Sequence, residues 1–200
     1  MVSSIISLVL RLVAFAAIHS LIASLPSKRL IMRAFGPKID RFYLPVYSLI
    51  TVLTLSPLAY QLYKKPGRIL YSIPSPWRWL MVGGQLIASI AAPIALFVDG
   101  PHRFKISSQL SGPETPEATP LNIRGLYRWV RDPFLLSGLI MMLLTPVMTV
   151  NRLIIYILTA VYLYLGSLHW ESRLVAQFGD EYREYQKRVH RIIPKLKGYN

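Results

Sequence analysis

The sequence predicts an all-α integral membrane protein with about five transmembrane helices, a C-terminal helical hairpin and a cytoplasmic amphipathic tail helix. Composition is the first reason, because 53% of the 200 residues are hydrophobic and only 16% are charged. Soluble domains carry about a quarter charged residues. The second reason is the recurrence of apolar blocks near the roughly 20 residues that cross a bilayer. Basic residues gather between these blocks, as expected for loops that flank membrane spans.

Three long apolar blocks predict the first three spans, at residues 4–25, 42–63 and 77–98. Each block is followed by helix breakers or charges, such as Pro26 after the first and Pro66 after the second. The N-terminal block is too long for the apolar part of a cleaved signal peptide, so we expect it to be retained as a span.

Two shorter blocks, residues 134–150 and 153–169, predict the fourth and fifth spans. Only Asn151 and Arg152 separate them, and a connection that short predicts an antiparallel helical hairpin. Pro146 should kink or end the fourth helix near its C-terminus.

The charge balance indicates an anionic lipid surface rather than a nucleic acid as the partner. Lys and Arg number 23 against 9 Asp and Glu, a net charge of +14, but they flank apolar blocks instead of forming a soluble basic face. The basic side of the predicted topology includes the tail, residues 171–200, which places the C-terminus in the cytoplasm and the N-terminus outside. Residues 106–122 form a polar lid or a linker. We expect one membrane domain over residues 1–200; no oligomeric state is indicated.

A basic aromatic run precedes the fourth span, and its arginines would share one face of a helix. An interfacial anchor is the ordinary interpretation. Pro133 disfavours helical geometry at Asp132, so a bend there would turn Arg131 towards a pocket. An arginine can bind a ligand carboxylate with two hydrogen bonds. The run contains Arg124, Tyr127, Arg128, Trp129 and Arg131.

Glu171 is the second candidate, because a carboxylate at the end of the fifth span is costly unless it is paired or hydrated. It could pair with Arg173 or with a loop arginine. It could equally face a cationic ligand, with Trp170 available for a cation–π contact. The residue pattern leaves both interpretations open.

The tail pattern predicts an amphipathic helix. Gly179 should break the preceding helix and Asp180 can serve as its N-cap, while Tyr182, Tyr185 and Val189 recur on one face. Such a helix could bind lipid or cover a cofactor pocket. Both interpretations remain open.

Other chemistry is less well supported. The chain has no cysteine, which excludes thiolate ligands and thiol nucleophiles. The histidines lack metal-site spacing, so no metal is expected, and His19 is best interpreted as a packed or hydrogen-bonded residue of the first span.

Three stretches of the C-terminal third carry longer motifs. They read GLYRWVRDPFLLSG at residues 125–138, TPVMTVNRL at 145–153 and ESRLVAQFGDEYREYQKRVHRIIP at 171–194. In this order they resemble the integral-membrane methyltransferase superfamily, which includes isoprenylcysteine carboxyl methyltransferases, phospholipid methyltransferases, NnrU-like proteins and methanethiol S-methyltransferases. HSLIAS, at residues 19–24, is similar to the NnrU-like branch.

The resemblance implies a methyltransferase that binds S-adenosylmethionine at the cytoplasmic ends of the last two spans, beneath the tail helix. The implied acceptor is a lipophilic molecule, or a small thiol or carboxylate, that reaches the interface from the bilayer. Arg131 and Glu171 are the implied catalytic residues, Arg131 for the donor's carboxylate and Glu171 for its positive charge. The implied cofactor-binding residues are Tyr127, Arg131, Asp132, Pro133, Glu171, Tyr182, Tyr185 and Arg191.

Two departures from the family pattern keep alternatives open. Asp132 stands where the family's R-H-P motif has histidine, and Leu135 stands where it has tyrosine. One alternative is a haem-containing NnrU-like isomerase with His19 as an axial ligand. The other is a non-catalytic membrane scaffold that keeps the fold.

Overall fold

The structure is a computed structural model that describes residues 2–99, 121 and 123–194. The polar lid or linker expected at residues 106–122 lies, apart from residue 121, outside the described residues.

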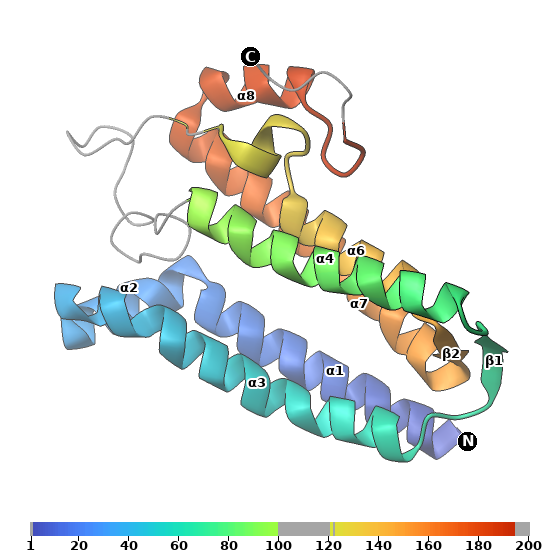
Figure 1. Cartoon of the computed structure of the whole chain (residues 1–200). Coiled ribbons are helices and arrows are strands. Elements are labelled where there is room, and N and C mark those ends of the chain that lie inside the picture. The colour runs from blue at the N-terminus through green and yellow to red at the C-terminus, as the bar shows by residue number, and fades with distance from the viewer. Residues whose placement is uncertain (1, 100–120, 122, 195–200) are drawn as a thin grey trace. The chain divides into compact units, whose positions relative to one another are not determined.

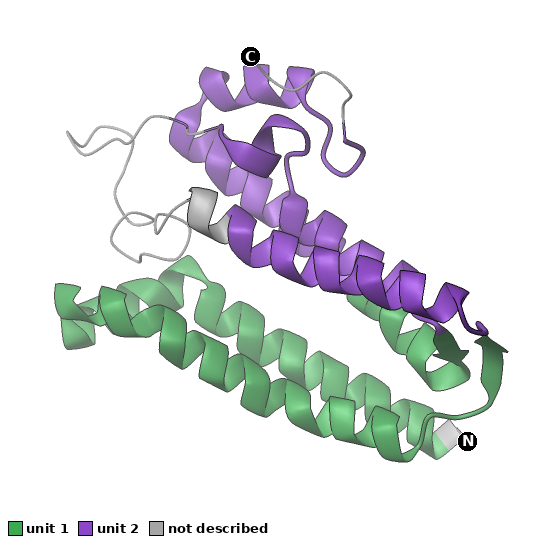
Figure 2. Cartoon of the chain, viewed as in Figure 1, with its two compact units in different colours: residues 1–72, 104–110, 147–159 green, residues 73–103, 111–146, 160–200 purple. Residues whose placement is uncertain are grey.

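The chain divides into two compact units, and the proposed site residues all fall in the second (Figure 2). The first unit contains the N-terminal helices and a small sheet, and the second contains the C-terminal helices. The first consists of residues 1–72, 104–110 and 147–159, and the second of residues 73–103, 111–146 and 160–200.

Among the described residues, four helices are long and apolar enough to cross a membrane. They are α1 (Val2–Ala23), α3 (Asp40–Lys64), α4 (Trp77–Asp99) and α7 (Val150–Phe178). A fifth apolar helix, α6 (Pro133–Leu143), has 11 residues. At 1.5 Å per residue it is about 16 Å long, too short to cross the hydrocarbon layer as a helix alone. The protein is therefore an all-α membrane protein, with one small sheet in the part that the structure describes.

In the first unit, α1 packs along α3 (Figure 1). The basic segment after α1, expected to be a loop, forms α2 (Leu25–Phe35) and a 3₁₀ turn, η1 (Pro37–Ile39). Ser24 caps α2 by accepting a hydrogen bond from the Ser27 backbone N–H, which satisfies one of the unpaired donors at the helix start.

The expected turn at Asn151 and Arg152 was wrong, because both residues lie in the first turn of α7. A strand, β2 (Val147–Thr149), precedes them and pairs antiparallel with β1 (Ile69–Ser72). The buried Asn151 side chain donates a 2.8 Å hydrogen bond to the Lys65 carbonyl, and this ties the start of α7 to the end of α3.

The fourth helix was expected to continue to residue 150, but α6 ends at Leu143. Pro146 follows and cannot donate a backbone hydrogen bond to a helix. Beyond it, the strand-forming residues Val147 and Thr149 pair with β1 instead. Sheet pairing therefore replaces the last part of the predicted helix.

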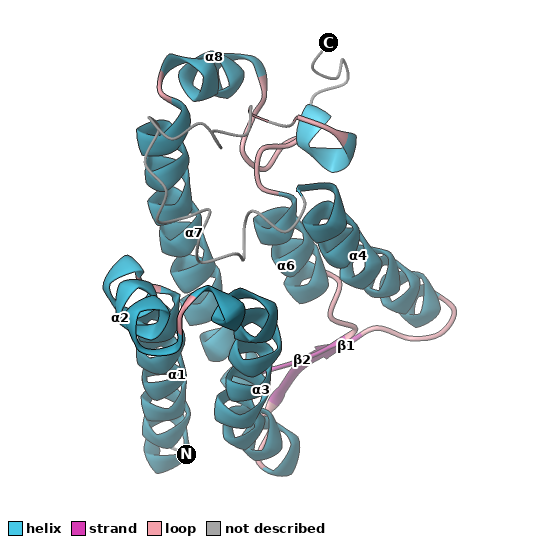
Figure 3. Ribbon diagram, turned by 90° about the vertical axis from the view of Figure 1, so that its left-hand side faces the viewer, coloured by secondary structure: helices cyan, strands magenta, loops and turns pink. Residues whose placement is uncertain are grey.

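In the second unit, α4 and α6 lie side by side (Figures 1 and 3). Gly84 permits this, since a Cβ atom there would lie 2.4 Å from Cδ1 of Leu144. Close by, the Gln85 side chain donates a 2.9 Å hydrogen bond to the Met141 carbonyl. The two helices therefore pack closely near the C-terminal end of α6.

At the other end of this unit the chain folds back on α7 (Figure 3). The fifth helix was expected to end at residue 169, but α7 continues to Phe178. Residues 170–178 contain no glycine or proline that would end a helix, and Gly179 is the first such residue after 169. Gly179 has φ 55°, a left-handed conformation that reverses the chain. The tail helix α8 (Asp180–Arg188) follows, with Gly179 rather than Asp180 as its N-cap.

In the structure, α8 has one buried face and one exposed face. Tyr182, Tyr185 and Val189 are at most 2% exposed and pack together, whereas Arg183 and Lys187 are exposed. The apolar residues that surround this cluster come from α7 and from the segment before α6: Leu121, Ile123, Leu174, Val175 and Phe178.

Candidate active site

Arg131 lies in a non-helical segment between the 3₁₀ turn η3 (Gly125–Arg128) and α6. Because η3 ends before Arg131, the expected shared helical face of the arginines was wrong. The Arg131 N–H donates to the His190 carbonyl at 2.9 Å, and the Asp132 N–H donates to the Arg191 carbonyl at 3.1 Å. This pairing brings the two residues before Pro133 and the segment after α8 to the same place.

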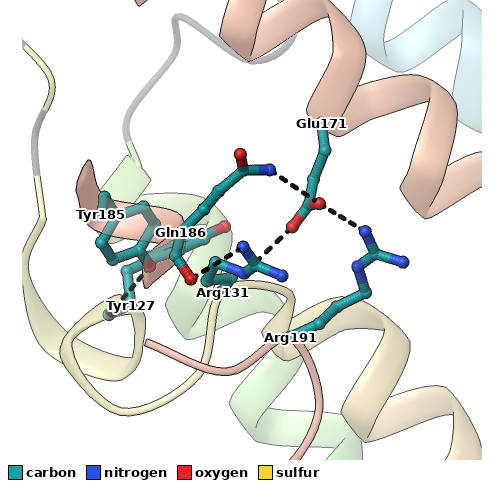
Figure 4. A network of polar contacts seen from close by, with 6 residues as sticks. All are labelled: Tyr127, Arg131, Glu171, Tyr185, Gln186 and Arg191. Carbon is teal, nitrogen blue, oxygen red and sulfur yellow. Dashed lines mark hydrogen bonds and ion pairs between the residues drawn. The ribbon is translucent and has the colours of Figure 1, made fainter. Parts of the chain in front are cut away.

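Glu171 lies between two arginines (Figure 4). Its Oε1 is 3.2 Å from Nε of Arg131, and its Oε2 is 2.5 Å from Nη2 of Arg191. The Gln186 side chain donates a 3.1 Å hydrogen bond to the same Oε2, while the Gln186 carbonyl accepts from Nη1 of Arg131 at 3.3 Å. We call these four residues the Glu171 cluster.

The Glu171 cluster is mostly buried and carries one more positive than negative charge. The side chains of Arg131, Glu171 and Arg191 are 13%, 7% and 18% exposed. The hydrogen bond that Arg191 donates to Glu171 raises the pKa of Arg191 above its ordinary value. Arg191 also lies over the Tyr164 ring, 5.4 Å from its centroid. Removal of one partner from a buried ion pair strongly destabilises the fold, because it leaves the other charge unpaired.

Several polar atoms of the Glu171 cluster are buried without a hydrogen bond to any described residue. They include Oε1 of Glu171 and the Nε atoms of Arg131 and Arg191. The 3.2 Å ion pair of Arg131 therefore lacks hydrogen-bond geometry. Unsatisfied buried polar atoms are costly in a native fold, so these three atoms are candidates for contact with a ligand.

The three predicted tyrosines hold the tail in place. The buried Tyr185 hydroxyl donates a 2.6 Å hydrogen bond to the Tyr127 carbonyl, and the Tyr182 and Tyr185 rings contact each other edge to face. These contacts fix α8 against the segment that carries Arg131. A direct role of Tyr127, Tyr182 and Tyr185 in donor binding stays a prediction.

Asp132 and Pro133 begin α6. The Asp132 carboxylate accepts a 2.9 Å hydrogen bond from the Leu135 N–H, which is the standard N-cap interaction. Pro133 occupies the first helical position, where its missing N–H costs nothing. The aspartate thus has a structural role where the family motif has histidine, and its predicted role in donor binding stays a prediction.

Gln186 belongs to the Glu171 cluster but was missed by sequence reasoning. It lies on α8 between the exposed Lys187 and the buried Tyr185, and its neighbours in sequence make it look like part of the solvated face. Its contact with Glu171 depends on the chain reversal at Gly179, which no local pattern around Gln186 indicates.

An apolar cleft of about 280 Å³ lies beside the segment that precedes α6. Its walls come from α4, α6 and the residues around η3. Val130 and Pro133 line the cleft, and they are the chain neighbours of Arg131 and Asp132. The cleft and the Glu171 cluster thus share the short segment 130–133.

His19, the candidate haem ligand, lies in a hydrogen-bonded network of the first unit. Its Nε2 is 2.5 Å from the Tyr47 hydroxyl and its Nδ1 is 3.2 Å from Oγ1 of Thr51. Both ring nitrogens thus have partners within the chain, which agrees with a hydrogen-bonded histidine. In the described part of the chain, no group of three or more His, Asp or Glu side chains is placed to hold a metal ion.

Comparison with curated proteins finds several similar to this chain. A methanethiol S-methyltransferase from Pseudomonas sp. (strain GM41(2012)) is 30% identical over 191 residues, which covers 90% of the chain and 70% of that protein. The methanethiol S-methyltransferase from Mycobacterium tuberculosis is 28% identical over 90% of the chain and 74% of its own length. Methanethiol S-methyltransferase 1 from Bradyrhizobium diazoefficiens is 39% identical over 39% of the chain, but the match spans only 28% of that protein.

No protein-family model and no solved structure matches the chain.

Proposed function

Because the chain belongs to the membrane methyltransferase family that includes the methanethiol S-methyltransferases, we propose that it transfers a methyl group from S-adenosylmethionine to a small thiol. The observation that carries the proposal is the buried Glu171 cluster, in which one carboxylate lies between two arginines and several buried polar atoms make no hydrogen bond to a described residue. The thiol acceptor follows the names of the relatives, which share only part of their length with this chain.

The Glu171 cluster fits the amino acid end of S-adenosylmethionine. Its excess positive charge suits the donor's carboxylate, which Arg131 can bind through its guanidinium. The buried Oε1 of Glu171, which accepts no hydrogen bond from a described residue, suits the donor's ammonium group. Arg191 and Gln186 hold the other carboxylate oxygen and so orient Glu171.

The proposed reaction requires little acid–base catalysis by the protein. When bound, S-adenosylmethionine would supply a methyl group attached to a positively charged sulfur. The thiol sulfur would bond to the methyl carbon as the bond between that carbon and the donor sulfur breaks. The electron pair of the broken bond would stay on the donor sulfur, and the thiol proton would go to water. The contribution of the chain is to orient the reactants and to exclude water from them. Arg131, Glu171 and Arg191 orient the donor, and α8 shields the cluster.

We further propose that the Glu171 cluster faces the cytoplasm, as the distribution of basic residues indicates. A charged donor would then arrive from the cytosol and a volatile or lipophilic acceptor from the bilayer. Cysteine variants offer a test, since the chain has no cysteine of its own. A Gln177→Cys variant in inside-out vesicles should react with an impermeant maleimide, and labelling only in right-side-out vesicles would reverse the topology.

The function is tested by supplying the purified, detergent-solubilised protein with S-adenosylmethionine and methanethiol. Headspace gas chromatography should detect dimethyl sulfide that depends on both reactants and on the protein. Protein that binds S-adenosylhomocysteine yet yields no methylated product from methanethiol or longer alkanethiols would refute the thiol acceptor. Protein that neither binds nor reacts would favour the scaffold alternative.

A further inference from the structure

We propose that the apolar cleft between α4 and α6 is the acceptor site, that its width is set by Ala91 and that Ser137 contacts the acceptor sulfur. This proposal rests on the proposed thiol methyltransferase function and adds where the thiol binds. It assigns the cleft to a small, apolar thiol with a short hydrocarbon substituent.

Small residues on one face of α4 create the cleft. Gly84, Ala88 and Ala91 are spaced four and three residues apart, so they share a face of the helix, and all three line the cleft. Gly84 is already closed off by Leu144, whose Cδ1 would lie 2.4 Å from an added Cβ. The open space therefore continues past Ala88 and Ala91 towards the start of α6.

The cleft is suited to an apolar guest and has one polar group. Among the described residues that line it, only Ser137 has a polar side chain. Its side chain is buried, and the structure records no hydrogen bond from its hydroxyl to another described residue. A lone hydroxyl in an apolar wall can donate a hydrogen bond to a sulfur or accept one from a thiol. Ser137 would therefore orient an uncharged thiol acceptor, and the described residues that line the cleft offer no group that pairs with a charged acceptor.

The position of the cleft connects it to the donor site. Val130 and Pro133 line it, and between them lie Arg131, which pairs with Glu171, and Asp132, which caps α6. A molecule in the cleft is thus one short segment of backbone away from the Glu171 cluster. Its volume of about 280 Å³ lies just below the usual range for ligand pockets, which begins at about 300 Å³, and this favours a small acceptor over a long lipid.

Substitution of Ala91 by Leu tests the width of the cleft, with Ala92→Leu as the matched control. Ala92 is the next residue on the same helix and does not line the cleft. We expect Ala91→Leu to lower kcat/KM for propanethiol by about 20-fold, which lies in the lower part of the range of about 10- to 200-fold for changes in an apolar pocket. The Kd for S-adenosylhomocysteine should stay within about twofold of wild type. Ala91→Val should give a smaller loss of the same kind.

Substitution of Ser137 by Ala tests the hydroxyl. We expect the KM for methanethiol to rise about fivefold, as for loss of one neutral hydrogen bond, with the Kd for S-adenosylhomocysteine unchanged. Ser137→Thr should restore a KM near the wild-type value, because it returns the hydroxyl.

The two proposals fail in different ways. A wild-type protein that methylates no thiol would refute the proposed function. An active wild-type protein whose Ala91→Leu and Ala92→Leu variants have equal kcat/KM for propanethiol would refute the acceptor site alone. Retained binding of S-adenosylhomocysteine shows that each variant is folded, and Ala91→Val covers the case in which Ala91→Leu does not fold.

Discussion

Two polar clusters in the described part of the chain, one half-buried and one mostly buried, differ in charge and in how completely their hydrogen bonds are made. In the first unit, His19, Tyr47 and Thr51 form a network whose side-chain donors and acceptors have partners. In the second unit, the Glu171 cluster combines two arginines with one carboxylate and leaves buried atoms without hydrogen bonds. A satisfied neutral network stabilises a helix pair, whereas a charged and incompletely satisfied one is suited to a ligand.

Of the substitutions in the two clusters, Glu171→Gln should have the largest effect on stability and activity. Two buried guanidiniums would lose their only observed carboxylate among the described residues, so we expect the free energy of unfolding to fall by about 3 kcal/mol. Methyl transfer should fall by about 100-fold, equivalent to about 2.7 kcal/mol. Thermal denaturation measures the loss of stability, and a separate headspace assay of the folded protein measures methyl transfer. Glu184→Gln is the matched control, because Glu184 also pairs with a cation but its side chain is exposed. The hydrogen bond that Lys187 donates to Glu184 lowers the pKa of Glu184. The Glu184→Gln substitution should leave both quantities unchanged.

The next largest effect is expected from Arg131→Lys. Lysine keeps the charge but not the fork of donors that binds a carboxylate with two hydrogen bonds. The Kd for S-adenosylhomocysteine should therefore rise about tenfold, or about 1.4 kcal/mol, as measured by calorimetry. The exposed Arg128 provides the control. An Arg131→Lys protein that binds as tightly as Arg128→Lys would mean that Arg131 is only a structural ion-pair partner.

A smaller effect is expected from Gln186→Leu. This change removes the side-chain hydrogen bond to Oε2 of Glu171 but keeps the backbone carbonyl that accepts from Arg131. We expect a loss of about 1.5 kcal/mol in the free energy of unfolding, as for a bond to a charged group. Chemical denaturation measures it. A loss no greater than that of the neighbouring, exposed Lys187→Gln would show that Gln186 does not support the cluster.

The smallest effect on activity should come from the neutral network. Tyr47→Phe removes the hydroxyl that contacts His19 and should lower stability by about 1 kcal/mol with no change in kcat/KM for methanethiol. The opposite result would be a Soret band in the wild-type protein whose position changes in the Tyr47→Phe variant. It would support the haem alternative, and the His19 network could then no longer be distinguished from the Glu171 cluster as a purely structural one.

Much of the fold was predictable because long apolar blocks carry a strong signal. The first three spans agree with α1, α3 and α4 to within a few residues. The C-terminal hairpin was less predictable, since Met141 to Leu144 continues an apolar run that gives no indication of where the helix stops. The end of α6 is set by Pro146 and by pairing of β2 with β1, a partner about 75 residues earlier in the sequence.

The candidate site was predictable only in part. The family motifs indicated the segments that carry Arg131, Glu171 and Arg191, and the structure brings these three together. Their geometry depends on the pairing of residues 131 and 132 with residues 190 and 191, which no local pattern indicates. The N-cap role of Asp132 was also missed, although an aspartate before a proline at a helix start favours it.

Calorimetric titration of S-adenosylhomocysteine into the folded protein in detergent tests the central claim most directly. The account predicts saturable binding to one site in the wild-type chain and clearly weaker binding to the Glu171→Gln variant. Folded wild-type protein that takes up no S-adenosylhomocysteine, or binds it equally well without the Glu171 carboxylate, would contradict a donor site at this cluster.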